Sequence, residues 1–158
     1  MPDLKFVDLF LNPKVYAILG AVISFLVAAL GSSKACGISG QAAAGVITEE
    51  PSRFSATMIL QALPATQSIY GFVIAFMIIG KISGVNTLEN GLSLFATGLP
   101  VGIVGYISAI WQGKVATAGI HLVAKRPEAL GNAIIYALMV EMFAILSLVV
   151  SILMLGQI

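Results

Sequence analysis

The chain has 158 residues, of which 59% are hydrophobic and only 9% are charged, and its net charge is +1. A soluble domain carries about 25% charged residues, so this composition excludes a water-facing surface over most of the chain and indicates an integral membrane protein. The small net charge excludes a polybasic nucleic-acid binder. The single cysteine, Cys36, excludes a disulfide framework within the chain and a cysteine-based metal site.

The first fourteen residues, MPDLKFVDLFLNPK, have mixed charge, and no cleavage site of small residues follows them closely. This pattern argues against a cleaved signal peptide. We expect the first membrane helix to act as its own insertion signal.

A helix that crosses a bilayer needs about 20 mostly apolar residues. Four segments meet this requirement, at residues 15–46, 54–79, 92–123 and 129–155. Polar segments separate them at 48–53, 80–91 and 124–131. The sequence therefore predicts an all-α membrane protein with four transmembrane helices.

The two halves of the chain look alike. In each half a helix of small residues carries one lysine, Lys34 or Lys114, and leads to a polar loop with a proline, Pro51 or Pro127, and then to an apolar helix. We interpret the chain as two tandem helical hairpins, at 1–79 and 92–158, joined by a linker at 80–91. Both hairpins run in the same direction, so the repeat is parallel rather than inverted.

The basic residues predict the orientation. The first loop carries Arg53 and the third carries Lys125 and Arg126, whereas the middle loop has Lys81 alone. Because cytoplasmic loops are enriched in Lys and Arg, we expect the first and third loops to be cytoplasmic. The linker and both termini are then extracellular.

The first and third apolar segments are rich in glycine, at positions that include 20, 31, 37 and 40 in the first and 98, 102, 105, 113 and 119 in the third. Small residues allow membrane helices to approach closely, and glycine lowers helix stability, so this density requires a packing reason. One interpretation is ordinary packing of a helical bundle. The other is a crowded inner ring of helices in an oligomer, with the second and fourth helices outside.

Glu141 lies in the middle of the last apolar segment, in the stretch LMVEMFAILSLVV, whereas the other acidic residues lie in termini or loops. An unpaired carboxylate at that depth costs at least roughly 2.5–3.5 kcal/mol. Because acidic residues inside a membrane are functional by default, we interpret Glu141 as a carrier of an ion or a proton. A protonated structural glutamate is the alternative.

Three polar side chains lie at one depth when residues are counted from the predicted cytoplasmic loops. Glu141 lies 14 residues beyond Pro127, and Gln67 lies 14 residues beyond Arg53. Gln112 lies 13 residues before Lys125. At about 1.5 Å per residue, each is roughly 20 Å from its loop. One carboxylate and two amides from three helices therefore predict a binding site.

The stretch LPATQSIY, at 63–70, adds oxygen atoms to this level. Leu63, Thr66, Gln67 and Tyr70 share one helix face by their spacing. Pro64 lacks an N–H and loosens the helix, which makes backbone carbonyls available to a ligand. A shell of oxygens suits a hard cation.

A single carboxylate balances one Na⁺ or one H⁺. The neutral oxygens of Thr66, Gln67 and Gln112 favour Na⁺, because a proton needs only the carboxylate. Interhelical hydrogen bonding is the alternative role for Thr66 and Gln67, and we expect Tyr70 to donate its O–H to Glu141. Aligning the halves on their prolines sets Glu141 opposite Ala65, which predicts one ion site per four helices.

With these residues in view, the chain resembles the proteolipid (K or c) subunits of bacterial V-type ATPases, the sodium-translocating kind, over essentially its whole length. The resemblance rests on GSSKACGISGQAAAGV, LQALPATQSIYGFVIAF, IWQGKVATAGIHLVAKRPE and MVEMFAIL. It implies a set of Na⁺ ligands, which are the Leu63 carbonyl, the Thr66 hydroxyl, the Gln67 and Gln112 amides and the Glu141 carboxylate. It also implies that Tyr70 hydrogen-bonds the carboxylate.

The resemblance further implies a multi-pass subunit of the cell membrane that assembles with identical copies into a closed rotor ring. Glu141 would carry Na⁺ across the membrane while ring rotation is coupled to ATP hydrolysis or synthesis. The implied partners are a stator membrane subunit with an essential arginine, central-stalk subunits and the lipid bilayer. The chain lacks the phosphate-binding pattern G-x-x-x-x-G-K-[ST], so we expect no ATP-hydrolysing site in it.

Three alternatives stay open at this point. The first is the same rotor carrying H⁺, and the second is a small antiporter that exchanges protons for a cation at Glu141. The third is a purely structural protein with four membrane helices.

Overall fold

The computed structural model describes residue 8 and residues 10–158. Its helices are α2 (Pro13–Glu49), α3 (Phe54–Ala62), α4 (Thr66–Lys81), α5 (Leu88–Lys125) and α6 (Leu130–Leu155), and the described residues form no strand. Within them, four stretches are long and apolar enough to cross a membrane, at Pro13–Glu49, Pro51–Gly84, Leu88–Lys125 and Pro127–Leu155. The predicted all-α, four-span architecture is thus confirmed. The expectation of no cleaved signal peptide concerns residues 1–14, of which 1–7 and 9 lie outside the described residues.

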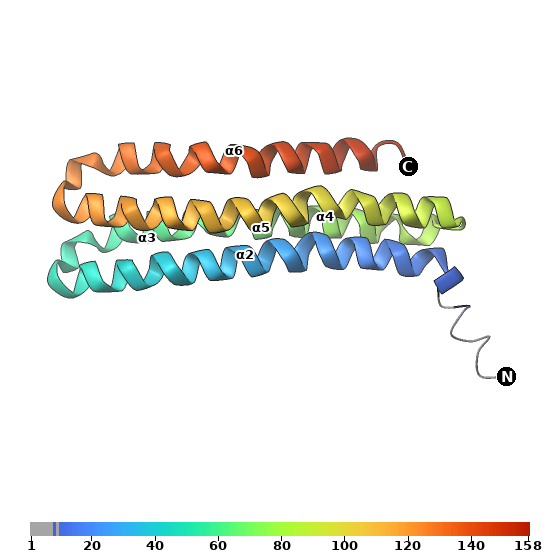
Figure 1. The fold of residues 1–158 in the computed structure, drawn as a ribbon, viewed down its shortest axis with the longest axis horizontal. Coiled ribbons are helices and arrows are strands. Elements are labelled where there is room, and N and C mark those ends of the chain that lie inside the picture. Colours follow the sequence, from blue (N-terminus) through green and yellow to red (C-terminus); the bar gives the residue numbers. More distant parts are fainter. Residues whose placement is uncertain (1–7, 9) are drawn as a thin grey trace.

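The four spans lie side by side as an elongated bundle (Figure 1). The start of α2, the connection from α4 to α5 and the C-terminus lie at one end, and the connections that follow α2 and α5 lie at the other. Helix α5 contacts α2, α4 and α6, so it is the central element of the bundle.

The helices extend further into the polar segments than the sequence predicts. Helix α4 continues to Lys81, a 3-10 turn covers Ile82–Gly84, and α5 already begins at Leu88, so the connection is shorter than the predicted linker 80–91. The early start of α5 has a local cause, since the Thr87 side chain accepts a hydrogen bond from the Asn90 N–H at 3.2 Å and caps the helix. The assignment of 1–79 and 92–158 to two hairpins stays a prediction.

The second span is interrupted where the sequence places Pro64. A 3-10 turn, Leu63–Ala65, separates α3 from α4, because proline lacks the N–H that a continuous α-helix needs there. Ser68, just after the turn, donates its backbone N–H to the Ser32 hydroxyl of α2 at 3.1 Å. The break is therefore stabilised by a neighbouring helix.

Glycines allow α2 and α5 to pack backbone against backbone. A Cβ added to Gly20 would lie 2.5 Å from the Leu94 carbonyl oxygen, and one added to Gly31 would lie 2.6 Å from the Tyr106 Cα. No side chain larger than hydrogen fits at these points without moving a helix. Most glycines of the two spans thus have a packing reason within the chain, whereas an added Cβ at Gly37 or Gly45 would meet no atom within 4 Å.

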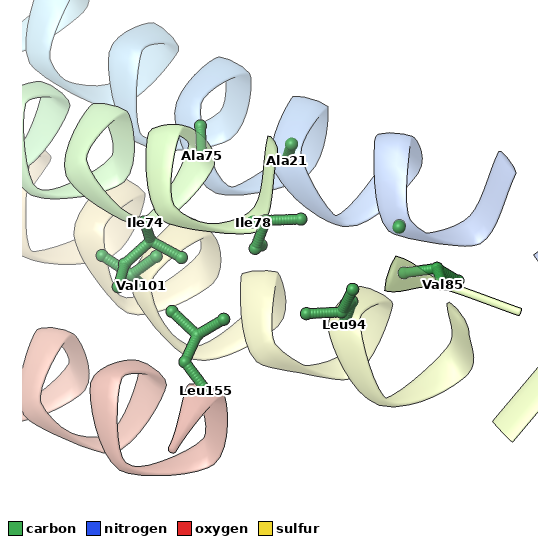
Figure 2. Close-up of a cluster of buried hydrophobic side chains, with 9 residues drawn as sticks. Ala21, Ile74, Ala75, Ile78, Val85, Leu94, Val101 and Leu155 are labelled. Atoms are coloured by element: carbon green, nitrogen blue, oxygen red, sulfur yellow. The ribbon is translucent and has the colours of Figure 1, made fainter. Parts of the chain in front are cut away.

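Two apolar clusters fill the two ends of the bundle. Figure 2 shows the first, where Ala21, Ile74, Val101 and Leu155 meet from four different helices. The second lies toward the opposite end and is formed by Ala43, Leu60, Ile120, Val123 and Ala133. The polar residues predicted for the site lie between the two clusters along the helices.

Candidate ion-binding site

The structure brings all six predicted site residues onto one hydrogen-bonded path. In order along the path they are Leu63, Thr66, Gln67, Gln112, Glu141 and Tyr70. They come from the 3-10 turn in the second span and from α4, α5 and α6. Counting residues along rigid helices placed them at one level, and the fold turns their side chains toward one another.

Glu141 is the charged member of the path. Glu141 is 5% exposed, and both of its carboxylate oxygens accept hydrogen bonds. Tyr70 donates its hydroxyl to Oε1 at 2.5 Å, and Gln112 donates through Nε2 to Oε2 at 3.0 Å. Both oxygens of this buried carboxylate are therefore hydrogen-bonded within the chain.

The two glutamines connect α4 with α5 and are fully buried. Gln67 donates through Nε2 to Gln112 Oε1 at 2.6 Å, and Gln112 also donates to the Ala137 carbonyl at 3.2 Å. An amide carries one oxygen and one NH₂ group, so a half-turn about its last bond exchanges an acceptor for donors. Each glutamine is thus able to present its oxygen to a cation.

Thr66 and Leu63 supply the oxygens at the other end of the path. The Thr66 hydroxyl donates to the Leu63 carbonyl at 2.9 Å and lies 3.5 Å from Gln67 Oε1. Three neutral oxygens from one short stretch are therefore neighbours. The break at Pro64 creates this geometry, because it changes how the backbone turns just before Thr66.

The chemistry of the site is that of one negative charge among neutral oxygens. Within the described residues there is no group of three or more His, Cys, Asp or Glu side chains that could hold a metal ion, so a site rich in carboxylates is not formed there. Tyr70 packs against the first apolar cluster and Leu63 against the second. Apolar surroundings strengthen electrostatic interactions because they lower the local dielectric constant.

Two serines that the sequence interpretation did not single out fix the helices around the site. Ser108 of α5 donates to the carbonyl of Val140, the residue before Glu141, at 3.0 Å. Ser32 of α2 accepts from the N–H of Ser68, the residue after Gln67. Both serines lie 19 positions before the loop proline of their own half, and that shared position is the signal that could have identified them.

Four membrane-length helices with one buried carboxylate at mid-depth, Glu141, among the described residues define a multi-pass membrane protein with a buried polar site. Comparison with known families gives a more specific result. The family of ATP synthase C subunits matches the chain twice, at residues 19–78 and 95–154. The chain belongs to this family.

Individual relatives agree with this assignment. The chain is 43% identical over 140 residues to the V-type sodium ATPase subunit K of Enterococcus hirae, and the match covers 89% of this chain and 90% of the relative. It is 37% identical to the A-type ATP synthase subunit K of Methanocaldococcus jannaschii, over 91% of this chain and 63% of that longer relative. It is 26% identical to the 16 kDa proteolipid of the V-type proton ATPase of Ovis aries, with coverages of 88% and 90%.

These matches confirm the family resemblance predicted from the sequence and place the chain among the rotor proteolipid subunits of V- and A-type ATPases. The double match confirms the internal duplication. The second matched segment begins 76 positions after the first begins and ends 76 positions after the first ends. That spacing sets Glu141 opposite Ala65, so only the second repeat carries the carboxylate.

Proposed function

We propose that the chain is a rotor subunit that carries Na⁺ across the membrane on Glu141. The observation that carries the proposal is the hydrogen-bonded path that joins the Glu141 carboxylate to the side-chain amides of Gln112 and Gln67 and to the hydroxyl of Thr66. In this proposal the ligands are those oxygens and the Leu63 carbonyl, and Tyr70 orients the carboxylate.

Na⁺ is favoured over H⁺ by the number of neutral oxygen atoms beside the carboxylate. A proton is bound by the carboxylate alone, and Gln67 and Gln112 would then be fully buried polar residues without a role in the ion chemistry. A dehydrated Na⁺ needs several oxygens to replace its water shell, as other hard cations do. The name of the Enterococcus hirae relative includes sodium.

Transport follows from charge compensation. A bare carboxylate facing lipid is costly, whereas a carboxylate paired with one cation is neutral as a unit. Identical subunits in a closed ring would bring each loaded site past lipid, from one access route in a stator subunit to another. An essential arginine of the stator would prevent empty sites from passing, and the central stalk would couple rotation to ATP hydrolysis or synthesis elsewhere in the complex.

The orientation proposed for the cell membrane places the connections after α2 and α5 in the cytoplasm. Figure 1 supports the placement of these two connections on the same side of the membrane, since they share one end of the bundle. Arg53 and Arg126 lie in them, in agreement with the enrichment of basic residues in cytoplasmic loops.

The second candidate is a rotor that carries H⁺. It is supported by the single carboxylate, which suffices for a proton, and by the relative named as a proteolipid of a V-type proton ATPase. Family membership favours either rotor over the antiporter and the structural protein, because the double match accounts for the duplicated hairpins.

The test is modification of Glu141 by a hydrophobic carbodiimide at increasing Na⁺ and constant ionic strength, with choline as the balancing cation. If Na⁺ binds at the carboxylate, labelling falls as Na⁺ rises and stays constant with choline. Labelling that is indifferent to Na⁺ but falls with rising pH would support the proton rotor and overturn the sodium proposal.

A further inference from the structure

Two flanks of the protein expose apolar surface. The α2–α4 flank is a groove whose lining includes Ile18, Val22, Phe25, Leu26, Phe72 and Phe76. The α5–α6 flank is a groove whose lining includes Val104, Ile107, Trp111, Val115, Val140 and Phe143. Lipid and protein could both cover such surfaces, so the flanks alone do not decide what lies against them.

The contact between the two repeats inside the chain supplies a template. Where α2 meets α5, the Tyr106 backbone lies against Gly31, and Ala35 lies against Gly113, where an added Cβ would be 2.7 Å from the Ala35 Cβ. One surface of the first repeat thus packs on a different surface of the second. Each repeat keeps the other of these two surfaces free.

The free surfaces are found by moving 76 positions along the chain, the spacing of the two family matches. Ala35 corresponds to Trp111 and Gly113 corresponds to Gly37. Ala35 is fully buried, whereas Trp111 is 55% exposed. A Cβ added to Gly37 would meet no atom within 4 Å, in contrast to one added to Gly113. The template contact therefore has both of its counterparts on the outside of the same molecule.

We propose that identical copies pack side by side by repeating this internal contact, with Trp111 of one copy seated at Gly37 of the next. The inference rests on the proposed homo-oligomer and adds its contact surface. Because the two surfaces differ, the contact is head-to-tail, which generates rings or open chains rather than two-fold dimers.

Both positions point away from the contact inside one chain. Gly37 is two residues beyond Ala35, and Trp111 is two residues before Gly113. Two residues turn a helix by about 200°, so each lies on the opposite side of its helix from the internal contact. Trp111 has a further neighbour, since the Lys114 Nζ lies 4.0 Å from the centre of its ring.

A second copy explains Gly37 better than lipid does. Glycine in a helix interior costs about 1 kcal/mol relative to alanine, and packing of lipid chains against the helix does not require the absence of a side chain. Close approach of another helix does require it. Gly37 and Trp111 also lie at similar depths, which supports a second copy of the chain as the neighbour of Gly37. Gly37 lies 14 positions before Pro51, and Trp111 lies 16 positions before Pro127.

The test is disulfide cross-linking of the full chain in membranes, with Cys36→Ser as the background because Cys36 is the single cysteine. Gly37→Cys combined with Trp111→Cys is expected to give a ladder of dimers, trimers and higher species on oxidation, since removal of the indole ring lets the two helices approach until the Cβ atoms are about 4 Å apart, as a disulfide requires. Either substitution alone should give no ladder. Linking by Trp111→Cys alone would indicate a two-fold contact and overturn the proposal.

The matched control is Gly45→Cys with Trp111→Cys. Gly45 is also an exposed glycine of α2 with no atom within 4 Å of an added Cβ, but it lies eight residues, about 12 Å, further along the helix. This pair is expected to give no ladder. Equal linking by both pairs would overturn the proposed register.

Two measurements on the unmodified protein separate the possible failures. Native mass of the detergent-extracted particle tests the oligomer, so a monomer contradicts the proposed function, whereas an oligomer without the ladder contradicts only this contact. Fluorescence of Trp111, the single tryptophan, tests the occupant in vesicles of brominated phosphatidylcholine. A buried interface predicts little quenching, and strong quenching would mean that lipid covers Trp111.

Discussion

Thr66 offers the sharpest test of whether neutral oxygens bind the transported ion. Thr66→Val removes one hydroxyl and keeps the shape of the side chain. In the folded chain this hydroxyl donates to the Leu63 carbonyl and lies 3.5 Å from Gln67 Oε1. The Leu63 carbonyl keeps the backbone N–H of Thr66 as a donor, so we expect the helices to retain their positions.

The expected loss is that of one polar contact to a charged group, about 1.5–3 kcal/mol. Since about 1.4 kcal/mol corresponds to tenfold in affinity, the Na⁺ concentration that half-protects Glu141 from carbodiimide should rise about 10- to 100-fold. Thr66→Ser keeps the hydroxyl and should restore most of the affinity.

The matched control is Thr57→Val in α3. Thr57 is a buried threonine, whereas Thr66 is half-buried, and the Thr57 hydroxyl donates to the carbonyls of Arg53 and Phe54 at 3.1 and 3.0 Å, away from the site. This variant should leave the half-protecting Na⁺ concentration unchanged. If both valine variants behave alike, the neutral oxygens of the second span take no part in ion binding, and the reasoning that favours Na⁺ over H⁺ fails.

Three further outcomes follow from the same geometry. Glu141→Gln should abolish ion transport in the assembled complex and leave the native mass of the subunit assembly unchanged, because the amide has nearly the same size; retained transport would remove Glu141 from the mechanism. Gly20→Ala should lower the thermal unfolding midpoint in detergent by several degrees, since its Cβ would lie 2.5 Å from a backbone oxygen of α5, whereas Gly45→Ala, which meets no atom within 4 Å, should maintain or raise it. Ser108→Ala should weaken Na⁺ protection roughly 2- to 10-fold through the loss of one neutral hydrogen bond, about 0.5–1.5 kcal/mol, that holds α6 beside Glu141; Ser147→Ala, whose hydroxyl bonds only within its own helix, should not, and equal effects would contradict a positioning role for Ser108.

Depth along the membrane was predictable from the sequence, because an α-helix rises by a constant amount per residue. That regularity is why Gln67, Gln112 and Glu141 could be assigned to one level before any packing was known. Their rotation toward one another was not predictable in the same way, since most residues of a membrane helix are apolar on every side and the hydrophobic pattern hardly distinguishes faces. The positions of Ser32 and Ser108 depend on the same sideways packing.

Helix ends were predicted less well, for a physical reason. Polar composition predicts loops at 80–91, but the Thr87 cap and the short 3-10 turn allow α4 and α5 to extend into that segment. A cap depends on one hydrogen bond between two particular residues, and composition averaged over a dozen residues does not detect it. The interruption at Pro64 was predictable because proline acts through its own covalent structure.

Divergence between the repeats has two different consequences. At the pair Ala65 and Glu141, the first repeat lacks the charge and contributes Thr66 and Gln67 from the same stretch, so residues of both repeats form the candidate site. At the pair Ala35 and Trp111, the first repeat has a small side chain in a contact so close that it requires Gly113. On the proposed contact between copies, the larger tryptophan replaces alanine against Gly37, so α5 and α2 of neighbouring copies would be further apart than α2 and α5 within one chain. The inner helices of the assembly would then alternate between narrow and wide spacings, and the candidate site would lie beside the narrow one, because its hydrogen bonds join α4, α5 and α6 of a single chain.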